Sequence, residues 1–218
     1  MTSFIGVYGA SGFGKEVMPL VRQQFPTLKK EQFVFIDDAQ AGTTLNNYSV
    51  LSYTDFIKQP MSNKLVTIAI ANSSVREKLV IQLNQDNIQH LSIQALNTVV
   101  LDEVEIGEGG LLCPFSCLTS NIKIGKFFHA NIYSYVAHDC VIGDYVTFAP
   151  GVKCNGNIII EDHAYIGTGA VIKQGTPDKP LVIGRGAVVG MGAVVTKSVP
   201  AGVTVVGNPA RILEKSNF

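Results

Sequence analysis

From about residue 100 the chain keeps a strict period of six, and this constrains its fold more than any other feature. Counting in sixes gives thirteen successive apolar positions: Val100, Ile106, Leu112, Leu118, Ile124, Ala130, Val136, Ile142, Phe148, Cys154, Ile160, Ile166 and Ile172. Helices repeat every 3.6 residues and half-buried strands every two, so neither explains this period. The pattern predicts a solenoid of 18-residue coils, each with three short strands, whose frame residues point inward and stack.

The six-residue period is interrupted once and ends in a segment of different composition. Residues 174–181, which include two prolines, break the register, and the frame resumes shifted at Ile183. We expect an excursion from one corner, serving either as filler or as a binding loop. The glycine- and proline-containing segments 199–202 and 207–211 are expected to form the closing cap.

The first half of the chain has a different rhythm, in which short apolar runs alternate with helix-like stretches. The expected strands are Phe4–Tyr8, Phe33–Ile36 and Leu65–Ile70, and the expected helices are Lys15–Phe25 and Ser73–Leu83. Alternation of this kind predicts a small parallel sheet with helices on its faces, a Rossmann-like α/β domain. We place this domain at residues 1–92 and the β-helix at 93–218.

Composition excludes several partner classes. The net charge is zero and 16% of the 218 residues are charged, which argues against a nucleic-acid partner. No apolar stretch reaches the length of a membrane span, and the first residues lack the features of a signal peptide. The four cysteines, at 113, 117, 140 and 154, show no zinc-ligand spacing, so a reduced, cytoplasmic protein is expected.

The repeat and the N-terminal motifs resemble a known family. The hexad of an aliphatic residue, glycine and a small residue, as in Ile142-Gly143, resembles that of left-handed β-helix acyltransferases. Together with the segment Tyr8–Lys15 and the pair Asp37-Asp38, it resembles bacterial sugar-nucleotide N-acetyltransferases of the PglD/NeuD type over essentially the whole chain. This resemblance implies the left-handed coil, acetyl-CoA as co-substrate, and a homotrimer with active sites between subunits.

Histidine suits the base that acetyl transfer to an amine requires. His138 stands two residues after a frame position, where side chains point outward, and Asp139 follows it. The resemblance implies that His138 is the general base and Asp139 its orienting carboxylate; the alternative is a solvent-facing turn histidine. We expect His129 and His163 at the surface or a subunit interface. The spacing of these three histidines does not favour a metal site, and none is expected.

The resemblance also assigns the acetyl-CoA contacts. Gly156 would donate its amide to the thioester oxygen, or it could be only a turn glycine. Asn131 would lie near the sugar amine, and Thr147 stands where relatives often carry a second histidine. The pantetheine and adenine path would involve Thr168, Gly190, Lys197, Pro209 and Arg211, for each of which coil packing is the alternative.

A glycine-rich turn before the first helix predicts a phosphate site, because helix N-termini offer free amides and a positive dipole end. The residues expected to bind the sugar nucleotide there are Gly9, Ser11, Gly12, Gly14 and Lys15. Asp37 and Asp38 could accept from a ribose or a uracil N–H, and Asn72 would form a further wall. The alternatives are turn glycines and helix caps. Phe13 departs from the polar residue of some relatives.

These assignments lead to a functional hypothesis. We expect an acetyl-CoA-dependent N-acetyltransferase that acts on the C4 amine of a nucleotide-linked 4-amino-4,6-dideoxy sugar. The favoured substrate is UDP-4-amino-4,6-dideoxy-N-acetylglucosamine, for glycan biosynthesis. The alternatives are a sialic acid-type O-acetyltransferase and a non-catalytic trimeric sugar-nucleotide-binding protein.

Overall fold

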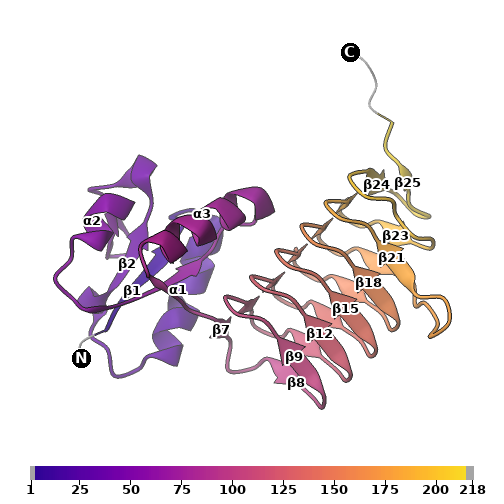
Figure 1. The fold of residues 1–218 in the computed structure, drawn as a ribbon, viewed down its shortest axis with the longest axis horizontal. Coiled ribbons are helices and arrows are strands. Elements are labelled where there is room, and N and C mark those ends of the chain that lie inside the picture. The colour runs from indigo at the N-terminus through magenta and orange to yellow at the C-terminus, as the bar shows by residue number, and fades with distance from the viewer. Residues whose placement is uncertain (1–2, 215–218) are drawn as a thin grey trace. The chain divides into compact units, whose positions relative to one another are not determined.

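A computed structural model describes residues 3–214 of the chain, which form two compact units (Figure 1). The units are Met1–Ala95 and Leu96–Phe218. The boundary predicted from the sequence lies three residues earlier, between residues 92 and 93. Within the described residues, no helix is long and apolar enough to cross a membrane.

The first unit is a six-stranded sheet with the order β3-β4-β2-β1-β5-β6, in which only the β3–β4 pair is antiparallel. Its strands are β1 (Ser3–Tyr8), β2 (Phe33–Ile36), β3 (Thr44–Leu45), β4 (Tyr48–Leu51), β5 (Asn63–Ile68) and β6 (Gln89–His90), and β7 (Ile93–Gln94) follows them. Its helices are α1 (Gly12–Gln24), α2 (Tyr53–Ile57) and α3 (Ser73–Gln85), with short 3-10 turns at Lys30–Gln32 and Asp38–Gln40. The predicted Rossmann-like α/β arrangement is confirmed.

The expected strands and helices are present with small shifts at their ends. The central strands β1 and β2 are buried almost throughout, as continuous apolar runs in a parallel sheet should be. Helix α1 begins at Gly12, three residues before the predicted start at Lys15. The glycine-rich turn therefore supplies the first turn of the helix and not only the loop before it.

The second unit is a parallel β-helix with three flat faces (Figure 1). One face stacks β10 (Leu111–Leu112), β13 (His129–Ala130), β16 (Thr147–Phe148), β19 (Tyr165–Ile166), β22 (Val188–Val189) and β24 (Thr204–Val206). The second stacks β8 (Val99–Val100), β11 (Cys117–Leu118), β14 (Tyr135–Val136), β17 (Lys153–Cys154), β20 (Val171–Ile172) and β23 (Val194–Val195). The third stacks β9 (Val104–Ile106), β12 (Ile122–Ile124), β15 (Cys140–Ile142), β18 (Ile158–Ile160) and β21 (Leu181–Ile183).

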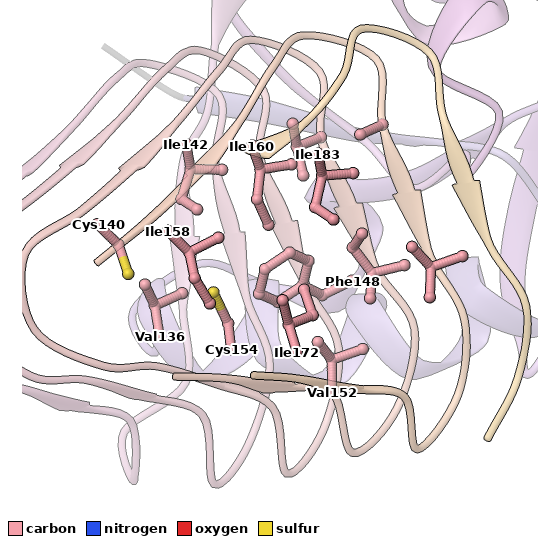
Figure 2. Close-up of a cluster of buried hydrophobic side chains, with 14 of the residues drawn as sticks. Val136, Cys140, Ile142, Phe148, Val152, Cys154, Ile158, Ile160, Ile172 and Ile183 are labelled. Carbon is pink, nitrogen blue, oxygen red and sulfur yellow. The ribbon is translucent and has the colours of Figure 1, made fainter. Parts of the chain in front are cut away.

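The hexad frame forms the core of this unit (Figure 2). Val136 pairs in register with Leu118 on one side and Cys154 on the other, so residues 18 apart lie one coil apart. All three are fully buried, as predicted. Val100 is only partly buried and Ile106 is 38% exposed, because their strands β8 and β9 are the edges of their sheets.

The corners of the coils contain residues with a left-handed backbone conformation, and equivalent residues of successive coils are 18 positions apart. One corner column contains Asn121, Asp139 and Asn157, with φ of 56°, 57° and 57°. A second contains Phe127, Tyr145 and His163, whose rings stack with centroids 5.4 and 5.1 Å apart. Left-handed φ is costly for residues with a Cβ, so the stacked rings and corner hydrogen bonds offset a cost repeated in every coil.

The two departures from the period are local additions to the prism. Residues 174–181 leave a corner as a loop closed by the Thr176–Lys179 bridge. An open hollow of about 610 Å³ lies beside it, with Lys173, Lys179 and Lys197 among its lining residues. At the C-terminal end, the antiparallel strand β25 (Arg211–Ile212) pairs with β24 and closes the stack as the expected cap.

Candidate active site

His138 and Asp139 form a hydrogen-bonded pair at the corner between β14 and β15. The His138 Nδ1 lies 2.7 Å from the Asp139 Oδ2, and both side chains are about half exposed, at 48% and 46%. The left-handed φ of Asp139 turns the chain at this corner, which allows the side chains of adjacent residues to meet. Because Nδ1 is engaged, the Nε2 of His138 is the nitrogen available to a substrate, the arrangement of a carboxylate-oriented base.

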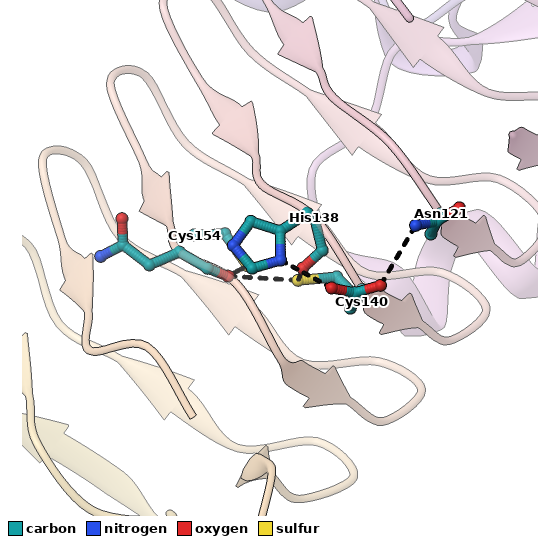
Figure 3. A network of polar contacts seen from close by, with 6 residues as sticks. Asn121, His138, Cys140 and Cys154 are labelled. Carbon is teal, nitrogen blue, oxygen red and sulfur yellow. Dashed lines mark hydrogen bonds and ion pairs between the residues drawn. The ribbon is translucent and has the colours of Figure 1, made fainter. Parts of the chain in front are cut away.

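Asn121 completes this pair and was not identified from the sequence. Its Nδ2 donates to the Asp139 Oδ1 over 3.3 Å (Figure 3). The hydrogen bond from His138, with a smaller contribution from Asn121, lowers the pKa of the Asp139 carboxyl. The 18-residue period contains the signal that could have found Asn121, since it lies one coil before Asp139 in the same corner column.

Gly156 lies against the imidazole of His138. A Cβ placed on this glycine would stand 2.5 Å from both Cε1 and Nε2 of the ring, so the ring covers its backbone. Gly156 is buried, and within residues 3–214 its amide N–H donates to no acceptor. The residue therefore differs from an ordinary turn glycine: its φ is not left-handed, and what excludes a larger residue is the histidine ring.

Cys140 and Cys154 point into the prism close to this site (Figures 2 and 3). They are 1% and 0% exposed, as expected for core residues. The contact with Cys140, and then burial, raise the pKa of the Cys154 thiol. The same contact lowers the pKa of the Cys140 thiol, but both side chains are buried inside the prism and neither faces the exposed side of the site.

Two further histidines lie elsewhere on the β-helix. The prediction that His129 is at the surface or an interface is wrong for this chain, because His129 is only 1% exposed. Its register partners Leu111 and Thr147 are buried as well, so the three coils that contain them shield this part of the column from solvent. His163 stacks on Tyr145 at its corner. Among residues 3–214 no group of three or more His, Cys, Asp or Glu side chains could hold a metal.

Some residues of the glycine-rich turn are required by the fold, and others are exposed and able to contact a ligand. A Cβ on Gly14 would stand 1.9 Å from the Gly9 carbonyl oxygen, and Gly9 itself has φ +107°, so both glycines are required by the turn. Gly12, the first residue of α1, meets nothing within 4 Å and is exposed. Ser11 is the N-cap residue but makes no capping hydrogen bond. Ser11, Gly12 and the exposed Lys15 thus leave polar groups at the helix N-terminus open to solvent.

The two aspartates after β2 have different environments. Asp37 accepts from the backbone of Ala10, Ala39 and Gln40 and from the side chain of Gln40, which occupies both of its oxygens. Asp38 is exposed and accepts from the Tyr53 N–H through Oδ1. Asp37 therefore fixes the turn, and Asp38 keeps an oxygen that a ligand can reach.

Asn72 and Tyr8, which lie at or after the ends of neighbouring strands, also have structural roles. Asn72 caps α3 by accepting from the Val75 N–H, which leaves its side-chain NH₂ exposed. Tyr8, at the end of β1, was not singled out in the sequence. Burial, followed by the charges of Asp38 and Asp37, raises its pKa to about 12, so its hydroxyl remains a donor at neutral pH.

The residues expected along the acetyl-CoA path spread over the later coils and the cap. Asn131 uses its Oδ1 to accept from the Ile132 N–H. Thr168 and Arg211 are exposed, Gly190 is half-buried, Lys197 lines the hollow beside 174–181, and Pro209 follows a cis peptide bond. Within one chain these residues do not surround His138.

Comparisons with known proteins agree with both units. Residues 5–83 match the family described as the PglD N-terminal domain. The chain is 52% identical to the GDP-perosamine N-acetyltransferase of Escherichia coli O157:H7 over 216 residues, which cover 97% of this chain and 96% of that protein. The chain belongs to the PglD-type sugar N-acetyltransferases. His138, Asp139 and Gly156 therefore lie in an acetyltransferase.

Solved structures of similar proteins share the whole architecture of this PglD-type chain. WeeI from Acinetobacter baumannii AYE is 83% identical, with a TM-score of 0.97 over 97% of this chain and 100% of that one. The acetyltransferase domain of PglB from Neisseria gonorrhoeae FA1090, solved in complex with acetyl coenzyme A, is 26% identical, with a TM-score of 0.84 over 97% and 99%. The predicted Rossmann-like domain followed by a left-handed β-helix is confirmed.

Proposed function

We propose that this acetyltransferase transfers an acetyl group from acetyl-CoA to the C4 amine of a nucleotide-linked 4-amino-4,6-dideoxy sugar. The observation that carries the proposal is the joint geometry of His138 and Gly156. The free Nε2 of a carboxylate-oriented histidine lies against Gly156, whose backbone N–H has no acceptor within residues 3–214. A base and an oxyanion donor side by side are what acyl transfer to an amine requires.

The reaction is a direct transfer. The Nε2 of His138 takes a proton from the amine as its nitrogen attacks the thioester carbonyl. The oxyanion of the tetrahedral intermediate accepts from the Gly156 N–H, and collapse of the intermediate releases the CoA thiolate, to which imidazolium returns the proton. Asp139 holds the ring in one tautomer and stabilises the imidazolium.

Two nucleotide sugars of this class are candidates. The relative that is 52% identical carries the name of a GDP-perosamine N-acetyltransferase, and perosamine is a 4-amino-4,6-dideoxy sugar. The UDP-linked N-acetylglucosamine derivative favoured from the sequence rests on the family resemblance of the residues alone. In both cases Ser11, Gly12 and Lys15 would bind the diphosphate at the start of α1, and Asp38 would accept from the nucleoside.

An assay of CoA thiol release tests this function and the base together. The panel includes GDP-perosamine, UDP-4-amino-4,6-dideoxy-N-acetylglucosamine and sialic acid, and kcat/KM ranks them. We expect turnover of one of the two amino sugars. His138→Ala should reduce kcat by at least about 10²-fold, the usual contribution of a general base. His90→Ala, a histidine of β6 bonded to Asn84, is the matched control.

Other outcomes would favour the remaining candidates. Turnover of sialic acid alone would identify an O-acetyltransferase. Tight nucleotide-sugar binding without turnover of any acceptor would identify a binding protein. Full activity in His138→Ala would refute the mechanism but leave the activity standing.

The dispersed acetyl-CoA residues support a homotrimer as part of this proposal. Outward-facing apolar side chains on the β-helix are exposed in one chain, including Val141 at 47% and Tyr165 at 37%. Contacts with further copies would bury such side chains and bring Asn131 or Thr168 of one subunit toward His138 of the next. Sedimentation equilibrium that gave the mass of one chain would contradict this assembly.

A further inference from the structure

The backbone ladder of the second face is interrupted once, at the coil that contains Gly156. On this face the residue after each frame position donates its N–H to the frame carbonyl of the next coil. This bond is made by Leu101, Thr119, Ala137 and Lys173, at 2.8 to 3.0 Å. The same bond from Asn155 to Ile172 is absent.

The Asn155 side chain takes the place of this missing bond. Its Nδ2 donates to the Ile172 carbonyl oxygen over 2.7 Å, the acceptor that the backbone N–H would otherwise use. Its Oδ1 accepts from the Tyr135 hydroxyl over 2.8 Å, which fixes the orientation of the amide. The side chain is thus held at both ends by groups from the neighbouring coils.

The replacement of the backbone donor by the Asn155 side chain affects the segment 155–156, which lies next to His138. With the side chain occupying the Ile172 carbonyl oxygen, the backbone N–H of Asn155 has no acceptor within residues 3–214. The N–H of Gly156 has none either, as is also true of Ser120 and His138 at the same position of the two preceding coils. The Asn155 carbonyl oxygen accepts from the Cys140 thiol over 3.2 Å, which holds the same peptide from the inner side. The Gly156 backbone therefore lies against the His138 ring, directly after a peptide that is released from the ladder and held on its inner side.

We propose that Asn155 is a positioning residue that holds the 155–156 backbone out of the ladder, so that the Gly156 amide is placed to bind the thioester oxygen in the transition state. The inference rests on the proposed acetyl transfer. An asparagine is suited to this task because it offers a donor to Ile172 and an acceptor to Tyr135 in one short side chain. Donors fixed before the reaction stabilise the oxyanion without reorganisation.

The variants Asn155→Ala and Asn155→Asp test the inference. Alanine removes both contacts and lets the backbone N–H return to Ile172, whereas aspartate keeps the acceptor for Tyr135 but places an oxygen against the Ile172 carbonyl. We expect kcat to fall by about 10- to 100-fold in both variants, somewhat less than on direct loss of an oxyanion donor. The KM for the sugar nucleotide and the pH dependence of kcat/KM should remain those of the wild type.

Two further variants separate positioning from general stability. Tyr135→Phe should lower kcat only a few-fold, because the Ile172 contact remains, and Tyr133→Phe, an exposed tyrosine stacked on Phe115, should leave kcat unchanged. Thermal melting at one protein concentration accompanies each kinetic measurement. Wild-type kcat in Asn155→Ala, or a loss that tracks a lowered Tm, would overturn the inference. Absence of acetyl transfer in the wild type would instead overturn the proposed function.

Discussion

At the scale of single residues, the site depends on an aspartate in a conformation that most residues avoid. Asp139 has φ +57°, and aspartate tolerates this region better than most residues with a Cβ. The corner directs its carboxylate to both His138 and Asn121. Because these hydrogen bonds lower the pKa of Asp139, the carboxylate remains ionised throughout the pH range in which a histidine can act as a base.

Asp139→Asn should therefore reduce kcat strongly with little change in KM. We expect a loss of about 10²- to 10⁴-fold, since an amide can hold the ring in the wrong tautomer and cannot stabilise the imidazolium. Asp102→Asn, at an exposed position of the first coil, serves as the control. The difference from the wild type should persist at every pH above the ordinary carboxyl pKa and disappear only as the pH falls through the lowered pKa of Asp139. Wild-type kcat in Asp139→Asn would contradict the orienting role.

Gly156→Ala tests the contact between the glycine and the histidine ring. The added Cβ would overlap Cε1 and Nε2, and the half-exposed ring can swing away, so the fold should tolerate the change. We expect kcat to fall by at least about 10-fold, because a displacement of about 1 Å misaligns the base, while Tm stays within a few degrees. Gly110→Ala is the control, since its Cβ would meet its neighbours no closer than 3.6 Å. Equal activity of the two variants would show that the ring contact is incidental.

At the scale of elements, the corners explain why coils carry aromatic residues at positions that usually favour glycine. Tyr145 has φ +58° and stacks on Phe127 and His163 within the same column. The stacking stabilises each corner against the cost of its left-handed backbone, and it links three successive coils along their edge.

Substitution of Tyr145 should separate these two contributions. Tyr145→Ala loses the stacking but keeps a Cβ in the left-handed region, whereas Tyr145→Gly loses the stacking and relieves the backbone. We expect the glycine variant to be the more stable of the two by about 1 kcal/mol, the reverse of the usual order inside helices and strands. Urea unfolding at one fixed protein concentration measures the difference. A less stable glycine variant would show that the corner is not strained.

At the scale of the whole molecule, the two units carry out different binding tasks, so single substitutions should separate them kinetically. Gly12→Ala places a methyl group at the open start of α1, where a diphosphate would approach the backbone, without touching the protein itself. It should raise the KM for the sugar nucleotide several-fold and leave that for acetyl-CoA unchanged. Lys197→Ala, beside the hollow at 174–181, should do the opposite. Parallel effects of both variants on both substrates would contradict this division.

Much of this architecture follows from local sequence. The six-residue period predicts the coil, its inward frame and the burial of Cys140 and Cys154, because a strand one hexad long can bury only the residues that point into the prism. The resemblance to PglD/NeuD-type enzymes, and not the adjacency of the two residues, assigned the base and its carboxylate to His138 and Asp139. That their side chains meet at this corner is a finding of the structure.

Contacts between coils were decided only by the tertiary structure. Asn121 reaches Asp139, His138 covers Gly156, and Asn155 displaces its own backbone from Ile172, each across a separation of about 18 residues. The burial of His129 likewise depends on its neighbours in the stack, where buried Leu111 and Thr147 lie on either side of it. The sequence by itself determined which residues face outward at each corner. Which of them touch depends on how far each side chain leans toward the next coil, and only stacked coils define that distance.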